Sequence, residues 1–339
     1  MHLTTNSYSI FKEAKKYCEE KELQMQCEEE LITIRINDDE MKTNDEKFLG
    51  KLKFTLAKQE ITRQTNVILN STWQGLITKS RIEDESIQSG CYSWLDKWKS
   101  CPTGTVSEVM LLQYQTLSTK CFLKYRLNDN EMDTKCRLCH IGDEHVKHLL
   151  SNCGELAKKL YVDRHNNALK CFFFRMLTKS GFSSKTPCWY SPEKVKPSYE
   201  NEQYSVFWDI PEYTGRDEED ESSLARPDGK IVMKSEKKIF LIEMTVPWID
   251  YRETKYLYKV GKYQAIQSNL RLEYPGYEID QVTLVMDVLG GHSKTLVDNI
   301  KKVLNDPTEV RNTIRDMQKC VISSAAHLVR YFKIRTASL

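Results

Sequence analysis

Three cysteines and one histidine gather in a short segment near the middle of the chain. Within CRLCHIGDEHVKHLLSNC, the side chains Cys136, Cys139, His148 and Cys153 are separated by two, eight and four residues. A C-x2-C turn aims two thiolates at one ion, and an H-x4-C pair on the following helical turns completes a tetrahedron. The spacing predicts a structural zinc knuckle, in which His145 stays open as an alternative nitrogen ligand to His148.

The composition indicates a folded, intracellular protein. The chain has 339 residues, of which 40% are hydrophobic, and its formal net charge is +2. This length predicts two or three structural units, and the near-neutral charge means that nucleic-acid binding would require local basic faces. The eleven cysteines come without a secretory signal or an apolar run long enough for a membrane span, so we expect reduced thiols.

Residues 1–130 are expected to form a mainly helical region. Apolar residues recur at helical spacing in IFKEAKKYCEEKELQ, at 10–24, and in SEVMLLQYQTLSTKCFLKYR, at 107–126. Two segments differ from this pattern. LITIRI, at 31–36, alternates as a strand does, and KFLGKLKFTL, at 47–56, is a second candidate strand.

The knuckle region is assigned to 131–155, and an α/β domain is predicted over 156–335. ELAKKLYVDRHNNALKCFFFRML, at 155–177, has the apolar spacing of one long helix. A segment rich in Ser, Lys and Pro, at 178–203, predicts a loop. YSVFWDI, at 204–210, then predicts the first strand of the domain.

An acidic run at 216–223, expected to be a solvated loop, separates that strand from a predicted β-hairpin, ARPDGKIVMKSEKKIFLIEMTVPWID. Asp228 opens its first strand, Glu243 lies near the end of its second, and Ser235–Lys238 form its turn. A two-residue loop would place Asp228 directly across from Glu243, and a four-residue loop would make them diagonal neighbours on one face. Either register brings two carboxylates together, which predicts Mg²⁺ or Mn²⁺ because these ions prefer oxygen ligands.

The hairpin is followed by a predicted helix, ETKYLYKVGKYQAIQSNLRL, which can add a lysine to the carboxylate pair. Lys259, Lys262 and Tyr263 project from neighbouring parts of one side of this helix. A strand at 279–291 and two further helices follow. Helix, three strands, helix and strand, with an Asp, a Glu and a nearby Lys, is the order of a restriction-endonuclease-like core. In such a core, carboxylates hold the metal that activates water, and the lysine orients the water or stabilises phosphate charge.

Several motifs together carry a resemblance to a known family. They are the knuckle and the segments RHN, RPD, EMTVP and KVGKYQ, which begin at Arg164, Arg226, Glu243 and Lys259. With them the chain resembles the C-terminal half of non-LTR retrotransposon polyproteins. More narrowly, it is similar to the site-specific class that ends in a restriction-like endonuclease after the reverse transcriptase. The resemblance is strong from about residue 130 to 300 and looser before that, where FLG at 48–50 resembles the chain just past the polymerase palm.

The resemblance implies target-primed reverse transcription, in which the endonuclease nicks a genomic strand and a polymerase extends the freed 3′ hydroxyl on the element's RNA. It therefore implies a nuclear protein. By the family's pattern Asp228 and Glu243 would hold the catalytic Mg²⁺ or Mn²⁺. Lys259 or Lys262 would be the catalytic lysine, with Tyr263 in support, and the zinc would be structural.

The candidate nucleic-acid contacts are Arg164, His165 and Arg226, with packing within the fold as the alternative role of Arg164 and His165. The partners that the resemblance implies are target DNA and the element's RNA. The chain departs from the family in having no aromatic-Ala-Asp-Asp polymerase signature. Asn37-Asp38-Asp39 matches that signature only in part and is expected to lie in a turn. A start beyond that signature is expected for a truncated element copy or a partial gene model. EMT also lacks the lysine that restriction enzymes often carry after the acidic residue, so the helix must supply it. The alternative is a zinc-containing, nucleic-acid-binding remnant without cleavage.

Overall fold

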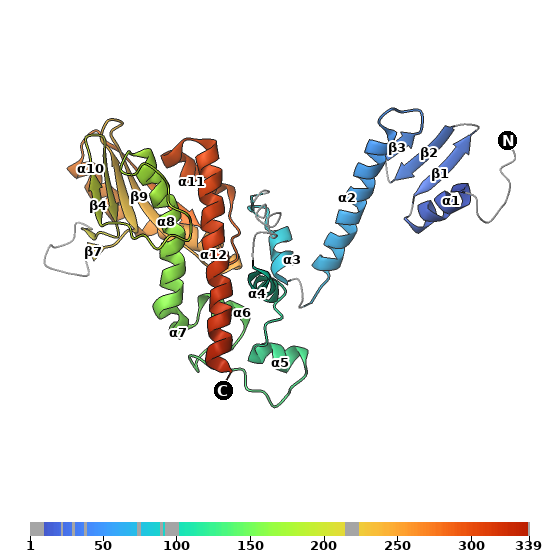
Figure 1. Cartoon of the computed structure of the whole chain (residues 1–339), viewed down its shortest axis with the longest axis horizontal. Coiled ribbons are helices and arrows are strands. Elements are labelled where there is room, and N and C mark those ends of the chain that lie inside the picture. The colour runs from blue at the N-terminus through green and yellow to red at the C-terminus, as the bar shows by residue number, and fades with distance from the viewer. Residues whose placement is uncertain are drawn as a thin grey trace. The chain divides into compact units, whose positions relative to one another are not determined.

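The computed structural model describes most of the chain, which forms two units, Met1–Ser71 and Thr72–Leu339 (Figure 1). The described residues are 10–21, 23–28, 31–36, 39–72, 76–88, 91, 102–213 and 224–337. The division falls near residue 71, so the helices that follow it pack with the second unit. The acidic run and the Asn37-Asp38 turn lie outside the described residues. Within the described parts of the chain, no helix combines the length and apolarity that crossing a membrane requires.

The first unit packs two helices and a small antiparallel sheet of order β1-β2-β3. Its elements are α1 (Ile10–Glu20), β1 (Gln24–Glu28), β2 (Leu31–Ile36), β3 (Asp39–Lys42) and α2 (Phe48–Leu69). The strand predicted at 31–36 is confirmed. The strand predicted at 47–56 is wrong, because this segment begins α2. Phe48, Leu52 and Leu56 recur every four residues and pack on the small core, and this helical period prevails over local alternation.

The second unit is a mixed α/β structure. Before its sheet come α3 (Leu76–Glu83), α4 (Thr103–Gln113), α5 (Lys120–Arg126), α6 (Val146–Ser151), α7 (Gly154–Leu156), the π-helical turn η2 (Ala157–Tyr161) and α8 (Val162–Lys179). The strands are β4 (Ser198–Glu200), β5 (Tyr204–Trp208), β6 (Glu212–Tyr213), β7 (Leu224–Ala225), β8 (Gly229–Met233), β9 (Lys238–Thr245) and β10 (Glu278–Val285). The remaining elements are η4 (Ile249–Tyr251), α9 (Arg252–Lys262), α10 (Gln264–Glu273), α11 (Lys294–Leu304) and α12 (Pro307–Thr336).

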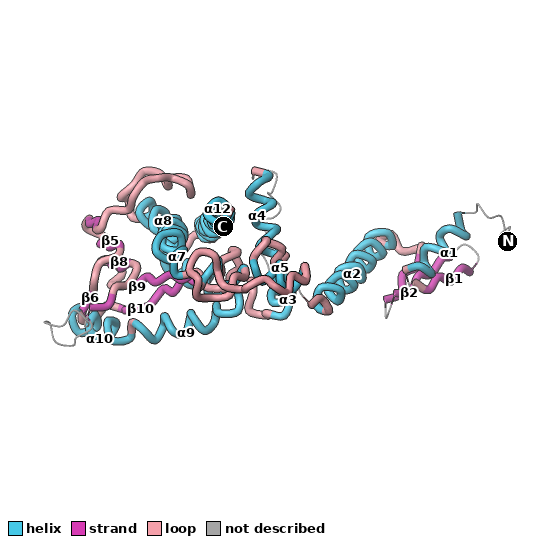
Figure 2. The backbone as a smooth tube through the Cα atoms, turned by 90° about the horizontal axis from the view of Figure 1, so that it is seen from below, coloured by secondary structure: helices cyan, strands magenta, loops and turns pink. Residues whose placement is uncertain are grey.

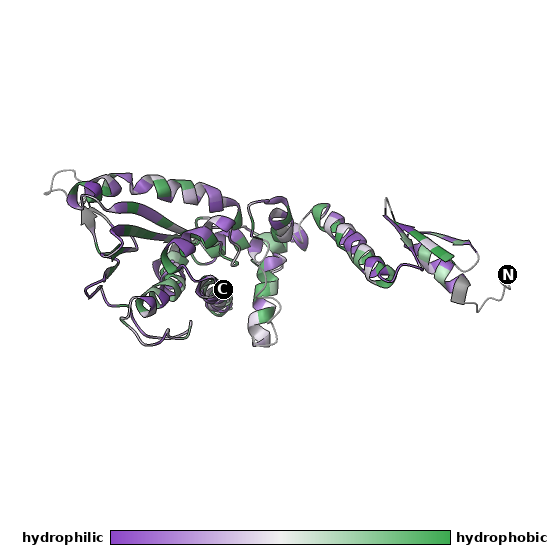
Figure 3. Cartoon of the chain, turned by 90° about the horizontal axis from the view of Figure 1, so that it is seen from above, coloured by the Kyte–Doolittle hydropathy of each residue, from purple (hydrophilic) through white to green (hydrophobic). Residues whose placement is uncertain are grey.

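The five-stranded sheet has the order β10-β9-β8-β5-β4, with β10 parallel to β9 and the other neighbours antiparallel. Figure 2 shows α8 and α12 on one side of β9 and β10, and α9 and α10 on the other. Phe172, Phe173 and Met176 of α8 enter the larger core with residues of the strands, α11 and α12. The helices carry both hydrophilic and hydrophobic residues (Figure 3), as expected when one face of each meets solvent. The predicted α/β class is therefore confirmed.

Three helices predicted as continuous are interrupted. The helix predicted at 155–177 contains the π-helical turn η2, and the one predicted over 253–272 breaks at Tyr263. The helix predicted at 107–126 ends at Gln113, and a new helix starts after Thr119, whose hydroxyl accepts from the Phe122 N–H at 3.2 Å. Each interruption changes which side chains share a face, and this change matters most for α8.

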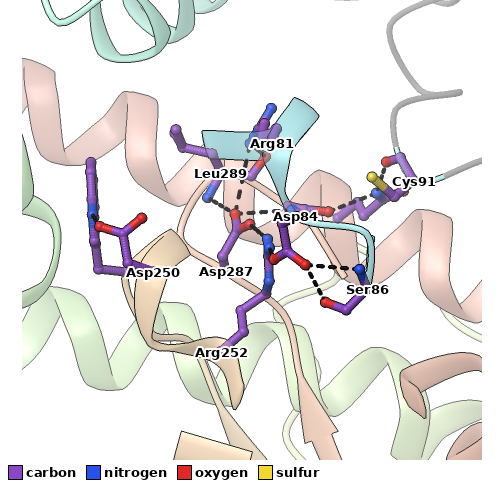
Figure 4. A network of polar contacts seen from close by, with 12 residues as sticks. Arg81, Asp84, Ser86, Cys91, Asp250, Arg252, Asp287 and Leu289 are labelled. Carbon is purple, nitrogen blue, oxygen red and sulfur yellow. Dashed lines mark hydrogen bonds and ion pairs between the residues drawn. The ribbon is translucent and has the colours of Figure 1, made fainter. Parts of the chain in front are cut away.

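A network of charged side chains joins α3 and the start of α9 to the loop after β10 (Figure 4). Arg252 donates through Nη1 to Asp287 Oδ2 at 2.6 Å and through Nη2 to Asp84. Asp287 is fully buried and also accepts from the backbone N–H groups of Leu289, at 2.8 Å, and Gly291, at 3.0 Å. This network anchors the first turn of α9, the helix that carries both candidate catalytic lysines.

Gly229 is required where β8 passes under α8. A Cβ added there would lie 2.2 Å from Phe173 Cζ and 2.8 Å from the Phe207 carbonyl oxygen. We expect Gly229→Ala to lower the free energy of unfolding by about 1–3 kcal/mol, because the backbone oxygen cannot move aside. The measurement is urea denaturation. Gly261→Ala is the control, since its Cβ would meet nothing within 4 Å and alanine favours helix, so equal losses at both sites would contradict this packing.

Candidate metal centres

The four predicted zinc ligands converge on one point in the second unit. The ligand atoms of Cys136, Cys139, His148 and Cys153 all lie within 4.8 Å of one another, and Cys139 Sγ lies 3.3 Å from His148 Nε2. A tight turn directs the first two thiols, because Cys136 donates its N–H to the Gly142 carbonyl at 2.8 Å. This cluster could hold a metal ion such as zinc, whose tetrahedral sites use these donor types.

His148 supplies the nitrogen of this cluster, whereas His145 has another role. His145 is the N-cap of α6, and its Nδ1 accepts from the His148 N–H at 2.9 Å. Burial lowers the pKa of His148, which favours the neutral imidazole that binds a metal. The choice between the two histidines that the sequence left open therefore falls on His148.

The knuckle is held to the domain by a buried ion pair and a stacked arginine. Arg137, which stands between the first two cysteines, donates from Nη2 to Glu144 Oε1 at 2.7 Å. Glu144 is fully buried and also accepts from the Lys120 N–H at 2.9 Å. The Arg137 guanidinium lies over the Phe332 ring of α12, 5.0 Å from its centroid. The position of the knuckle is thus set by contacts with α5 and α12.

Arg164, predicted to contact nucleic acid, is instead buried beneath the knuckle. It is 3% exposed, its Nη1 donates to the Leu150 carbonyl at 2.9 Å, and its guanidinium lies over the Tyr161 ring. Burial lowers its pKa to about 10. The Tyr161 hydroxyl in turn donates to the Leu149 carbonyl at 2.7 Å. The expectation for Arg164 is therefore corrected, because a side chain packed in this way does not reach a phosphate on the surface.

The hairpin adopts the register in which the two carboxylates face one another. Gly229 pairs with Ile242 and Met233 pairs with Lys238, so one step further Asp228 lies across from Glu243. The turn comprises residues 234–237, one residue earlier than predicted, and Lys237 takes a positive φ of 51°. This register equals that of the two-residue-loop alternative of the sequence analysis, although four residues separate the two strands, and it brings the carboxylates together at one end of β8 and β9.

Glu243 is buried with one oxygen paired and one unpaired. It is 2% exposed, its Oε1 accepts from Lys259 Nζ, and its Oε2 has no hydrogen-bond partner among the described residues. Burial, followed by the nearby charge of Asp228, raises the pKa of Glu243. A buried, unsatisfied carboxylate oxygen beside a second carboxylate is costly, and a divalent cation would relieve that cost. The residues therefore fit a hard metal ion.

The two candidate lysines differ in what they contact. Lys259 reaches Glu243, whereas Lys262 Nζ donates to the Tyr263 hydroxyl at 3.0 Å and lies over the Tyr263 ring. Tyr263 is fully buried and donates to the Arg226 carbonyl at 3.1 Å. Tyr263 thus links α9 to the segment before Asp228. Lys259 is the lysine placed at the carboxylate pair.

His165, predicted to contact nucleic acid, lies against Asp228. Its Nε2 is 3.1 Å from Asp228 Oδ2 and 3.1 Å from the Met244 carbonyl oxygen. Burial alone would lower the pKa of His165, but the hydrogen bond and charge of Asp228 raise it to about 9. The sequence analysis did not predict this contact. The one indication that His165 has a functional role was its place in the RHN segment, which belongs to the family resemblance.

Arg226 is the predicted nucleic-acid contact that stays on the surface. Its side chain is 62% exposed and lies 3.5 Å from Asp209 Oδ1. It stands two residues before Asp228, so a phosphate held at the carboxylates would lie near it.

No family model matches the chain, and no curated protein does either.

Proposed function

We propose that the chain is a divalent-metal-dependent DNA endonuclease with a restriction-like core, in which the zinc knuckle helps to hold nucleic acid. In line with the family resemblance, it would nick target DNA in the nucleus to prime reverse transcription for a non-LTR retrotransposon. One observation carries the proposal. Glu243 and Lys259 are in contact at the end of the sheet where the hairpin register also brings Asp228, and Glu243 keeps an unsatisfied buried oxygen.

In this proposal Asp228 and Glu243 would hold Mg²⁺ or Mn²⁺, which supplies a polarised phosphate oxygen and an activated water. Lys259, 20% exposed at its side chain, is placed to offset negative charge that develops on the phosphate. Arg226 is available to bind a neighbouring phosphate. Water adds to phosphorus and the bond to the 3′ oxygen breaks, which leaves a 5′ phosphate and a free 3′ hydroxyl.

Nicking of supercoiled plasmid by the zinc-loaded full chain tests this function. We expect conversion to open circles with Mg²⁺ or Mn²⁺, and none with Ca²⁺ or a chelator. DNA binding is followed in parallel by fluorescence anisotropy. Binding without nicking under any of these ions would reject the nuclease and favour a nucleic-acid-binding remnant. If the chain shows neither binding nor nicking, both the nuclease and the nucleic-acid-binding remnant are rejected.

The two lysines are expected to differ in their effect on nicking. Lys259→Met should lower the rate by about 100-fold, because it removes the cation that contacts the carboxylate pair. Lys262→Met should have a much smaller effect, since Lys262 contacts the phenol of Tyr263. Single-turnover nicking in Mg²⁺ measures both, and a larger loss at Lys262 would contradict the assignment.

A further inference from the structure

His165 belongs to α8 and Lys259 to α9, and these two helices lie on opposite sides of β9 and β10 (Figure 2). The Nε2 atom of His165 faces two acceptors, Asp228 Oδ2 and the Met244 carbonyl oxygen, each at 3.1 Å. Nε2 therefore carries a proton and donates to both. Through this ring the Asp228 carboxylate is tied to the backbone of β9.

A second donor meets the same oxygen of Asp228. The backbone N–H of Met244 donates to Asp228 Oδ2 at 2.6 Å. Two donors thus converge on Oδ2, and neither of these hydrogen bonds uses Oδ1. Their combined effect is to fix the rotation of the carboxylate and leave Oδ1 for a cation, as partners beyond the ligands do at metal sites.

Asp228 needs such support because it precedes the paired residues of β8. It lies between β7 and β8, where its carbonyl accepts only from the Asp209 N–H at 3.0 Å among the backbone bonds described. A free carboxylate there would rotate away from Glu243, since the two charges repel. A cationic or donor group on Oδ2 opposes that rotation.

Both nitrogens of the His165 ring have hydrogen-bond partners. Its Nδ1 lies 2.9 Å from Asn166 Oδ1, and Ala168 and Leu169 bury the next turn of α8 in the core. The π-helical turn at Ala157–Tyr161 ends four residues before His165 and resets the phase of the helix that carries it. Single π-helical turns inside α-helices are frequent at functional sites.

We propose that His165 is a positioning residue that holds Asp228 in the orientation needed to bind a divalent metal together with Glu243. The proposal rests on the proposed metal site. Its consequence is a metal affinity, which is measured without any cleavage.

The test compares His165→Met with His165→Gln in the zinc-loaded full chain. The two side chains have the same length, but only glutamine keeps an N–H donor for Asp228. Free Mn²⁺ is counted by electron paramagnetic resonance. We expect His165→Met to raise the Kd for Mn²⁺ by about 10- to 100-fold and His165→Gln to restore most of the affinity. His327→Met, at an exposed histidine of α12, should leave the Kd unchanged.

The outcomes separate this inference from the proposed function. An unchanged Kd in His165→Met, or an equal loss in His165→Gln, would overturn the positioning role. So would a parent chain that binds no more Mn²⁺ than the Asp228→Asn, Glu243→Gln double variant. If the parent chain binds Mn²⁺ at the carboxylate pair but does not nick DNA, the proposed nuclease function is rejected. The positioning role is then judged by the ratio of the Mn²⁺ Kd of His165→Met to that of the parent chain. If His165→Met does not fold by circular dichroism, His165→Ala replaces it in the same comparison.

Discussion

Asp228→Asn and Glu243→Gln are each expected to lower metal-dependent nicking by about three orders of magnitude. Each change removes one anionic ligand of the proposed metal site while keeping the size of the side chain. The metal is expected to contribute several kcal/mol to the transition state, and each 1.36 kcal/mol is tenfold in rate. Glu243→Gln also removes the anion that Lys259 contacts, so its effect should be at least as large. Single-turnover nicking in Mg²⁺ and Mn²⁺ measures the loss.

The control for these variants is Asp298→Asn, which removes a half-buried carboxylate of α11 that pairs only with Lys301 among the described ion pairs. Its nicking rate should equal that of the parent chain. DNA affinity measured in Ca²⁺ should change little in all three variants, because the phosphate backbone supplies most of the binding. Nicking that survives in both site variants would show that the cleavage comes from elsewhere or from a contaminant.

The Cys/His cluster and the carboxylate pair could be predicted from sequence because each depends on local spacing. The C-x2-C turn spans four residues, and the hairpin register follows from two strands joined by a short turn. Sequence left the choice between His145 and His148 open because both stand on the same short segment. The structure separates them, because His148 Nε2 lies 3.3 Å from Cys139 Sγ whereas His145 Nδ1 accepts from the His148 N–H.

What the sequence could not provide are contacts that depend on helix phase and on distant segments. One long helix was expected through Arg164 and His165, but the π-helical turn shifts every side chain after it. It turns Arg164 toward the knuckle and His165 toward Asp228. The ion pair between Arg252 and Asp287 joins residues 35 apart, and no local pattern reports it. The strand predicted at the start of α2 is wrong for a different reason. A short stretch of sequence does not reveal that the residues packed on the core recur every four positions.

These long-range contacts show why the two centres belong to one folded unit. Tyr161 and Arg164 sit at the junction of η2 and α8, and both bond to carbonyls of α6, the helix that carries His148. His165 follows directly and reaches Asp228. One continuous helical segment therefore connects the candidate zinc ligands to the carboxylate pair, so disruption of the first candidate centre is expected to disturb the second.

Replacing Cys136 and Cys139 by serine is expected to remove the metal and destabilise the second unit. The parent chain should contain about one zinc per chain by elemental analysis and the variant none, because hydroxyls do not replace thiolates as zinc ligands. Cys136, Cys153, Leu149 and Leu150 share a buried cluster with Trp248 and Phe332. Apparent binding energies of structural zinc reach about 10 kcal/mol or more in small fingers, so its loss should unfold the knuckle and lower the melting temperature markedly.

Matched single variants make the zinc prediction specific. Cys188→Ser, at an exposed cysteine of the same unit, should keep both the zinc and the melting temperature. His148→Ala should lose the zinc, whereas His145→Ala should keep it and cost about 1 kcal/mol, the usual effect of removing a helix cap. If nicking fails in the zinc-free variant while its Mn²⁺ affinity also falls, the α6–α8 connection transmits the damage. A zinc-free chain with unchanged stability would refute the structural role of the knuckle.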